Sequence, residues 1–231
     1  MSGGGVLEVV HPGVRSVVQD WPGRTGLQAK GLFPAGPMDP VAFRIANLLV
    51  GNQEGQAALE IPMGAFAVRA HTEVLAALCG AEGAGATLNG EPVPLWQTLR
   101  LRPGDLLACQ SARGPGYRLY LALAGGLRVP EVLGARALHT TSGVGGLDGR
   151  PLVVGDVLEV DDPGPGERPL LRLPQVLRPT YHTHWEVEVV PGPHADPEFL
   201  TADDWRELVT RTWPVALGSD REGVRLGAHR F

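Results

Sequence analysis

The sequence predicts a mainly β protein, built as a closed or nearly closed β-barrel with a few short helices. Short apolar runs follow one another along most of the chain, and turn residues separate them. Only two segments show the apolar period of a helix. Closely spaced strands with so few helices favour a barrel, because closure leaves no strand edge exposed. A chain of 231 residues is long enough to bury a sizeable core.

The expected strands are apolar runs with turn signals between them. Asn89-Gly90 is typical of a two-residue hairpin, Pro103-Gly104-Asp105 separates two further runs, and another hairpin is expected around Gly155-Asp156. One run is almost continuously apolar, which is the pattern of a strand buried on both faces. That run is 117–126, and the other expected strands are 57–61, 65–70, 73–80, 86–93, 96–102, 105–110, 150–154, 157–160 and 185–192.

The first helix is expected to begin at Pro40, because Asp39 is able to accept hydrogen bonds from free N–H groups and proline suits the first helical position. It ends before Gly51. Its predicted buried stripe is Val41, Ile45, Leu48 and Leu49, with Met38 also expected to be buried.

The second helix opens at Thr201, and Asp204 three residues later completes a capping box. Its predicted buried stripe is Trp205, Leu208, Val209 and Trp213. Before this helix, the Pro- and Gly-rich segment 161–169 has the composition of a linker. We therefore expect a first region at 1–165 and the start of a second subdomain at 166–231.

Composition argues against several classes of partner. The net charge is −5, and arginines are scattered in ones and twos without a basic cluster, so neither nucleic acid nor an anionic membrane is expected to bind. A small molecule or another protein fits better. No leader pattern and no membrane-length apolar run occurs. Cys79 and Cys109 lie in apolar runs and are expected to be buried thiols, which predicts a cytoplasmic protein.

Several common catalytic motifs are missing from the chain. It has no P-loop, no G-x-S-x-G nucleophile elbow, no H-E-x-x-H and no C-x-x-C. His182 and His184 would share one face of a strand, but no third ligand lies nearby in sequence, so we expect solvated histidines and assign no metal ligands.

The richest candidate site is the loop that begins after Val17 and leads into the first helix. It holds the polar residues Gln19, Asp20 and Arg24 among closely spaced glycines. Asp20 could act as a base or orient water, and the Arg24 fork suits a carboxylate or phosphate. The alternative is a local ion pair that holds a Gly-rich turn, and the sequence leaves both open. The predicted catalytic residues are therefore Asp20 and Arg24, and the predicted substrate- or anion-binding residues are Gln19, Gly23, Gly26, Gly36, Asp39, Ser219, Asp220 and Arg221.

Ordered blocks along the chain resemble one known family. These blocks are QDWPGRTG, FPAGPMDPVAFRIANLLVGN, ALEI, GYRLYLALAGGLRVPEVLGAR, SGVGGLDGR, VVPGPHAD and GSDREGVRL. Together they resemble the allophanate hydrolase subunit 2-like family, also called biotin-dependent carboxyltransferase or urea amidolyase-related. That family includes the KipA-like C subunit of bacterial 5-oxoprolinase. The resemblance extends from Val6 to about Leu226.

The resemblance implies a cyclophilin-like β-barrel and a multi-subunit hydrolase. Its partners would be a KipI-like (allophanate hydrolase subunit 1-like) protein and a LamB/YcsF-like subunit, and the joint reaction would open 5-oxoproline to glutamate with ATP. ATP would phosphorylate the poorly electrophilic lactam oxygen, and Arg24 and Arg221 are of the right type to bind phosphate or carboxylate. The nucleotide need not bind this chain. Members of the family usually continue further, so the second subdomain is expected to be incomplete.

Two other readings stay open. The chain could be a binding protein that sequesters a KipI-like kinase inhibitor without catalysis. It could also belong to a urea or allophanate pathway as a biotin-dependent carboxyltransferase. Its only lysine, Lys30, lies in AKGL and lacks the Met-Lys pair of biotin-attachment sites, so covalently bound biotin is not expected.

Overall fold

The computed structural model describes residues 6–111, 113–194, 198–221 and 223–227. The chain divides into two compact units, Met1–Thr183 and His184–Phe231, and each is described by itself. The first unit continues past the expected boundary at 165, because the following segment packs on it: Leu171 O accepts a hydrogen bond from Thr98 N and Leu173 N donates one to Trp96 O, both at 2.8 Å. The expected domain assignment itself stays a prediction.

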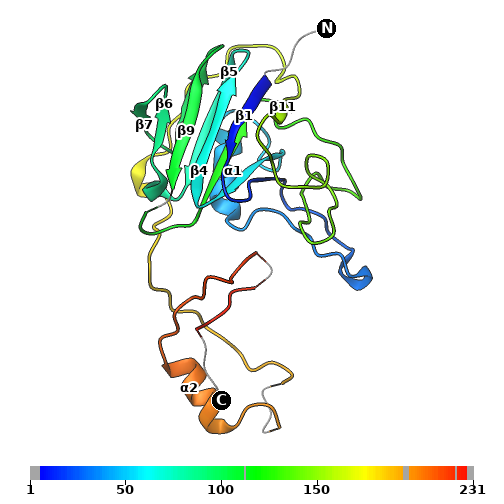
Figure 1. Cartoon of the computed structure of the whole chain (residues 1–231), viewed down its shortest axis with the longest axis vertical. Helices are drawn as coiled ribbons and strands as arrows, with labels where there is room; N and C mark the ends of the chain where they lie inside the picture. The colour runs from blue at the N-terminus through cyan, green and yellow to red at the C-terminus, as the bar shows by residue number, and fades with distance from the viewer. Residues whose placement is uncertain (1–5, 112, 195–197, 222, 228–231) are drawn as a thin grey trace. The chain divides into compact units, whose positions relative to one another are not determined.

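The first unit contains two antiparallel sheets, so the predicted mainly β class is confirmed (Figure 1). An isolated bridge between Leu127 and Val160 joins the segment after β10 (Arg118–Leu123), which lies in one sheet, to the segment after β11 (Val157–Glu159), which lies in the other. The six-stranded sheet has the order β11 (Val157–Glu159), β1 (Val6–Pro12), β4 (Gly64–Ala70), β9 (Leu106–Ser111), β6 (Ala86–Leu88) and β7 (Glu91–Val93). The five-stranded sheet has the order β2 (Val17–Gln19), β3 (Ala58–Pro62), β10 (Arg118–Leu123), β5 (Val74–Gly80) and β8 (Thr98–Leu101).

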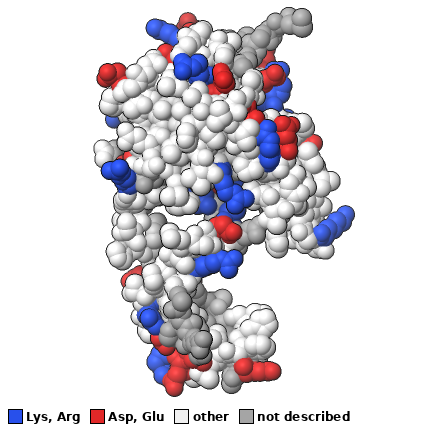
Figure 2. All heavy atoms as spheres, viewed as in Figure 1, with Lys and Arg blue, Asp and Glu red and all other residues white. Residues whose placement is uncertain are grey.

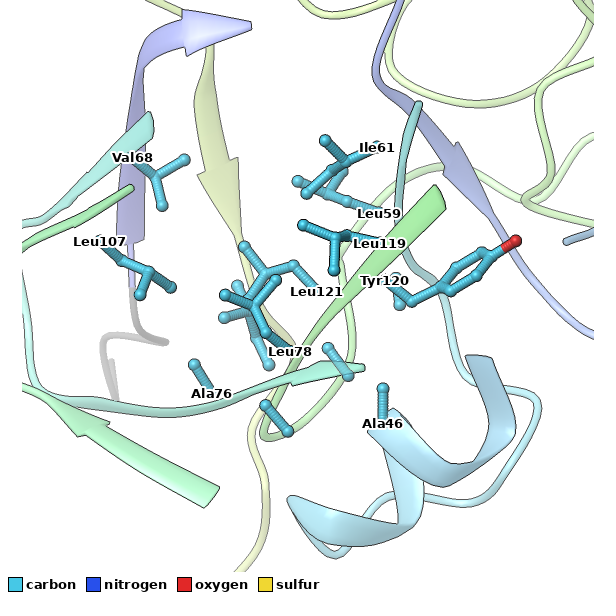
Figure 3. Close-up of a cluster of buried hydrophobic side chains, with 14 of the residues drawn as sticks. Ala46, Leu59, Ile61, Val68, Ala76, Leu78, Leu107, Leu119, Tyr120 and Leu121 are labelled. Atoms are coloured by element: carbon cyan, nitrogen blue, oxygen red, sulfur yellow. The ribbon is translucent and has the colours of Figure 1, made fainter. Parts of the chain in front are cut away.

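One hydrophobic core lies between the sheets. The five-stranded sheet contributes alternate residues of its central strands, and the six-stranded sheet contributes residues such as Val68 and Leu107 (Figure 3). Each side chain that is fully buried in this core stabilises the fold by about 1.5–3 kcal/mol. The residues of β3 and β10 in this core include Leu59, Ile61, Leu119 and Leu121. Because side chains alternate along a strand, the residues between them point to the opposite face of the sheet.

Helix α1 (Pro40–Leu49) covers that opposite face, where it contacts β10 and β5. The predicted start is confirmed, since the Asp39 side chain accepts a hydrogen bond from Ala42 N at 3.0 Å. The predicted buried stripe is wrong in part, because Val41 and Leu48 are exposed. The helix instead buries a face whose small alanines allow close approach to the sheet, with Phe43 edge-on to Tyr120 at 5.8 Å. The residues of that buried face are Ala42, Phe43, Ala46, Asn47 and Leu49.

The predicted turns differ in what they connect. Asn89-Gly90 joins β6 to β7, as expected, and both residues have positive φ. The turn at 103–105 joins β8 to β9, but these strands lie in different sheets. The hairpin expected at 155–156 is wrong, because 150–154 forms no strand: Asp156 instead accepts hydrogen bonds from Val153 N and Arg150. Strands β1 and β2 were not predicted.

The second unit contains helix α2 (Ala202–Thr210), and the predicted capping box of Thr201 and Asp204 is confirmed. No residue of α2 is buried, so the predicted buried stripe is wrong. The strand expected at 185–192 is also wrong. Within the described part of the chain this segment pairs with no strand, and its apolar side chains are exposed. A run of strand-forming residues becomes a strand only where another strand supplies hydrogen bonds.

The cysteines and the surface charge agree with the composition. Cys79 and Cys109 are free and buried, as predicted. No helix in the described ranges is long and apolar enough to cross a membrane. On the face shown in Figure 2, acidic and basic side chains are interspersed among uncharged ones.

Candidate functional site

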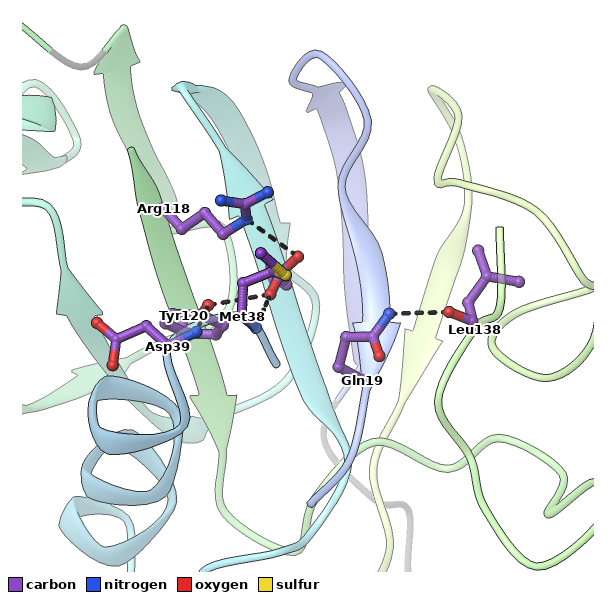
Figure 4. A network of polar contacts seen from close by, with 7 residues as sticks. Gln19, Met38, Asp39, Arg118, Tyr120 and Leu138 are labelled. Atoms are coloured by element: carbon purple, nitrogen blue, oxygen red, sulfur yellow. Dashed lines mark hydrogen bonds and ion pairs between the residues drawn. The ribbon is translucent and has the colours of Figure 1, made fainter. Parts of the chain in front are cut away.

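The predicted loop is held against the segment 132–138 by its own polar side chains. Gln19 lies at the end of β2 and donates through Nε2 to Leu138 O at 3.0 Å (Figure 4). The two carboxylate oxygens of Asp20 accept from Arg136 N at 2.6 Å and from Ala137 N at 3.1 Å. The side chains of Gln19 and Asp20 therefore satisfy backbone hydrogen-bonding groups of the segment 132–138, which forms no strand.

Arg24 continues the same attachment and is 0% exposed. Its Nε donates to Val132 O at 2.9 Å, and its Nη2 donates to Ala135 O at 3.3 Å and Ala137 O at 3.0 Å. A side chain at Gly145 would come within 2.7 Å of Nη2, so only glycine fits beside the guanidinium. The guanidinium is thus enclosed by backbone on several sides.

Electrostatics couples the two predicted catalytic residues. Burial raises the pKa of the Asp20 carboxyl, and the two N–H groups and the charge of Arg24 oppose that shift. Burial lowers the pKa of Arg24, and Asp20 opposes this. The hydrogen bonds of Asp20 and those of Arg24 Nε and Nη2 go to the backbone of 132–138, as a structural role requires, whereas Arg24 Nη1 is buried without a hydrogen-bond partner among the described residues. A catalytic role for Asp20 and Arg24 stays a prediction.

The loop glycines have different surroundings. Gly23 and Gly36 lie where two parts of the loop cross: a Cβ at Gly23 would be 2.6 Å from Pro34 O, and one at Gly36 would be 3.1 Å from Pro22 O. Both also have positive φ, so the close backbone contact and the backbone conformation each favour glycine at these positions. At Gly26 an added Cβ would meet nothing within 4 Å, which leaves its positive φ as the only local constraint.

A buried carboxylate at Glu60 forms a second polar centre, which the sequence interpretation missed. Glu60 of β3 is 2% exposed and lies opposite Tyr120 of β10 on the face covered by α1. Its Oε2 accepts from the Tyr120 hydroxyl at 2.9 Å and from Met38 N at 2.8 Å, and its Oε1 accepts from Arg118 Nε at 3.3 Å (Figure 4). Hydrogen bonds from three donors make this buried charge tolerable.

Asp39 links this centre to the start of α1. Its backbone N–H donates to the Tyr120 hydroxyl at 2.8 Å, while its Oδ2 accepts from the Tyr181 hydroxyl at 2.6 Å. Burial, aided by the nearby Glu60 charge, raises the pKa of Tyr120 well above its ordinary value. Burial and the Asp39 hydrogen bond raise the pKa of Tyr181. Both phenols therefore stay protonated and act as hydrogen-bond donors at neutral pH.

A signal for this centre was present in the sequence. Glu60 stands in the run ALEI, and Tyr120 stands in the run YLAL. A single polar side chain within a strand that is otherwise apolar must be paired if it is buried. Two such residues on neighbouring strands predict a shared hydrogen bond once the strand order is known.

The predicted residues Ser219, Asp220 and Arg221 belong to the second unit. Ser219 Oγ accepts from Arg225 N at 2.9 Å and donates to Arg225 O at 3.2 Å. Asp220 Oδ1 accepts from Gly223 N at 3.1 Å. These bonds define a polar turn within that unit. In the described ranges, no group of three or more His, Cys, Asp or Glu side chains is arranged to hold a metal ion.

Comparisons with known proteins place the chain among carboxyltransferase-type domains. Residues 30–230 match the family described as "Carboxyltransferase domain, subdomain A and B". The chain is 36% identical over 229 residues to urea amidolyase of Lachancea kluyveri, a match that covers 95% of this chain and 12% of that protein. It is 34% identical over 223 residues to the C subunit of 5-oxoprolinase of Escherichia coli, and the match covers 96% of this chain and 68% of the relative.

The fold agrees with a solved relative. The crystal structure of K. lactis urea amidolyase aligns with a TM-score of 0.87 at 34% identity, covering 99% of this chain and 14% of that one. The chain thus spans only a small part of the urea amidolyases it matches. The 5-oxoprolinase relative is by its name one subunit of a larger enzyme.

Proposed function

This chain belongs to the carboxyltransferase domain family, subdomains A and B, and we propose that it is the component equivalent to the C subunit in an ATP-dependent enzyme that opens 5-oxoproline to glutamate. The observation that carries this proposal is the similarity to the Escherichia coli 5-oxoprolinase C subunit, which covers 96% of this chain and 68% of that protein. The proposed partners are a KipI-like protein and a LamB/YcsF-like subunit.

The proposed reaction requires activation of a poor electrophile. The γ-phosphoryl group of ATP is transferred to the lactam carbonyl oxygen, and water then attacks the carbonyl carbon. The ring C–N bond breaks, the nitrogen takes up a proton, and a second water hydrolyses the resulting γ-glutamyl phosphate to glutamate and phosphate. A component that positions substrate for these steps needs a rigid loop and cationic groups. The loop of 19–39 supplies the first, because Gln19, Asp20 and Arg24 attach it to the segment 132–138.

Within this proposal, Asp20 and Arg24 act as positioning residues. Five hydrogen bonds from this pair go to backbone atoms, so their contribution to turnover is to hold the loop in one conformation. Gly23 and Gly36 allow the loop to cross itself.

A second candidate rests on the identity to urea amidolyase, which is 36% for the Lachancea kluyveri protein. In that case the chain is the carboxyltransferase part of a biotin-dependent urea-carboxylating enzyme. Biotin would then be supplied by another protein segment.

Reconstitution tests both candidates. The chain is mixed with its KipI-like and LamB/YcsF-like neighbours, ATP and 5-oxoproline, and glutamate is measured with and without this chain. A rate that does not depend on the chain refutes the subunit assignment and favours a binding protein. A parallel reaction with urea and bicarbonate, with and without avidin, tests the second candidate. Biotin-dependent carboxylation inhibited by avidin would replace the 5-oxoprolinase assignment.

Variants test the role of the loop. Asp20→Asn and Arg24→Ala are expected to lower turnover by well over tenfold, with Arg15→Ala as an exposed control. For a positioning role, Arg24→Lys should recover part of the turnover. Loss of activity in strict proportion to loss of folded protein would instead assign the pair to stability alone.

A further inference from the structure

The outer edge of the Arg118 guanidinium faces away from the Glu60 centre. Arg118 and Tyr120 lie on the same face of β10, and Glu60 lies on the neighbouring strand. Nε of Arg118 donates to Glu60 Oε1 at 3.3 Å. Among the residues that the structure describes, its two terminal nitrogens have no hydrogen-bond partner, and Figure 4 shows them pointing away from the bond to that carboxylate. The side chain is 18% exposed, so a molecule from solvent is able to reach it.

The guanidinium is held in a fixed orientation. Its partner Glu60 is itself fixed by Tyr120 and by Met38 N, and the ring of Tyr117 lies 5.0 Å from the Arg118 guanidinium carbon. A planar fork whose orientation is set in advance loses little side-chain entropy when it binds a planar carboxylate through two parallel hydrogen bonds.

The charge of Glu60 does not remove this capacity. Glu60 contacts Arg118 through Nε and is also hydrogen-bonded by Tyr120 and Met38, so its negative charge is shared among at least these three donors. The four N–H groups on the terminal nitrogens of Arg118 remain, and a bidentate carboxylate uses two of them.

Exposed apolar side chains belong to residues close to Arg118. Met38 is 44% exposed and Tyr117 is 49% exposed, and the partly exposed Met63 donates its N–H to Tyr117 O at 2.7 Å. Methionine adapts its shape to a ligand, and the tyrosine ring offers a flat apolar surface. Such a frame favours a carbon body over a strongly hydrated phosphate.

We propose that the outer edge of Arg118 binds the carboxylate of a small acid with an apolar body, and that Met38, Met63 and Tyr117 contact that body. Glu60 is a positioning residue for Arg118. The choice of 5-oxoproline as one probe rests on the proposed function, whereas the assignment of Arg118 rests on the contacts above.

The test is a ligand-observed NMR titration of the full chain with four probes in the millimolar range. These are cyclopentanecarboxylate, 5-oxoproline, 2-pyrrolidinone, which lacks the carboxylate, and inorganic phosphate. The variants are Arg118→Gln and Arg118→Lys, with Arg44→Gln as the matched control. Arg44 also has a carboxylate partner, Glu54, and an aromatic ring, Trp21, but it lies elsewhere on the surface. Thermal melts establish that each variant is folded.

Arg118→Gln is expected to weaken the binding of cyclopentanecarboxylate by at least about tenfold, because a charged bidentate contact is lost. The affinity of Arg118→Lys should lie between those of Arg118→Gln and the parent chain, and the affinity of Arg44→Gln should equal that of the parent chain. Binding of 2-pyrrolidinone should be weak and should not depend on Arg118. If cyclopentanecarboxylate follows this pattern while 5-oxoproline fails to bind, Arg118 keeps its assignment and the proposed function is weakened.

Three results would overturn the assignment. The first is equal carboxylate binding by the parent chain and Arg118→Gln. The second is that neither cyclopentanecarboxylate nor 5-oxoproline binds to the parent chain. The third is an Arg118-dependent affinity for inorganic phosphate above that for both carboxylates. Normal glutamate production in the reconstituted enzyme together with any of these results would leave the proposed function standing and remove only the Arg118 site.

Discussion

Replacement of Arg24 by alanine tests whether the loop is held by its buried guanidinium. Arg24 is 0% exposed and donates to the carbonyls of Val132, Ala135 and Ala137. In Arg24→Ala the Ala137 carbonyl loses its side-chain donor, and the carbonyls of Val132 and Ala135 keep only the hydrogen bonds from each other's N–H groups. The half-buried carboxylate of Asp20 also loses a nearby positive charge.

The magnitude follows from these contacts. A buried acceptor left without a partner costs about 1–3 kcal/mol, and each of the two carbonyls that keep a donor loses a hydrogen bond of about 0.5–1.5 kcal/mol, so the total is about 2–6 kcal/mol. Removing the guanidinium also removes the cost of burying its charge, which brings the expected loss to about 2–4 kcal/mol. For a domain of this size that corresponds to a fall in melting temperature of about 4–16 °C. Arg24→Lys keeps the charge but lacks the planar guanidinium, so its free energy of unfolding should lie between those of Arg24→Ala and the parent chain.

The assay is urea unfolding followed by tryptophan fluorescence and far-UV circular dichroism. Arg15→Ala is the control, because Arg15 is an exposed arginine near the same loop. The control is expected to change the free energy of unfolding by less than about 0.5 kcal/mol. A loss below about 1 kcal/mol for Arg24→Ala would refute the reasoning, because it would show that the three carbonyls find other partners at little cost.

Three further changes test other contacts by the same unfolding assay. Tyr120→Phe removes a buried hydroxyl with two hydrogen-bond partners and should cost about 1.5–3 kcal/mol, whereas Tyr117→Phe, at a half-exposed ring, should cost less than about 0.5 kcal/mol. Phe43→Ala should cost about 3–5 kcal/mol, but Met38→Ala less than about 1 kcal/mol, and equal losses would contradict the observed exposures. Burial raises the pKa of Asp20 in the folded chain above its ordinary value of 3.8. Protonation of Asp20 therefore adds most to the free energy of unfolding below pH 3.8, and this contribution is lost as the pH rises through the folded pKa. The stability of the parent chain relative to Asp20→Asn should therefore decline above pH 3.8, and an increase would refute the assigned shift.

Local patterns predicted the elements whose signals lie within a few residues. The start of α1 and the capping box of α2 were correct because each depends on a side chain and an N–H three residues apart. The Asn89-Gly90 turn was correct for the same reason. The buried face of α1 was not, since it is chosen by the sheet surface: Phe43 faces Tyr120, which is distant in sequence.

The candidate site shows the same division. The loop of polar residues and glycines was identified from spacing, but the partners of Asp20 and Arg24 lie more than 100 residues away in sequence. Glu60 and Tyr120 come together only through the pairing of β3 with β10, which no short-range pattern specifies. The interpretation of 185–192 failed for a related reason, because a strand requires a partner that the run itself does not contain.

The attachment of 136–138 to the loop has a consequence for hydrogen exchange. Arg136 N and Ala137 N donate to the Asp20 carboxylate, and Leu138 N donates to Val18 O. Three successive amides outside any strand should therefore exchange as slowly as strand amides. They are released only when Asp20 and β2 separate from them together, so this irregular segment and the loop should open as one cooperative unit.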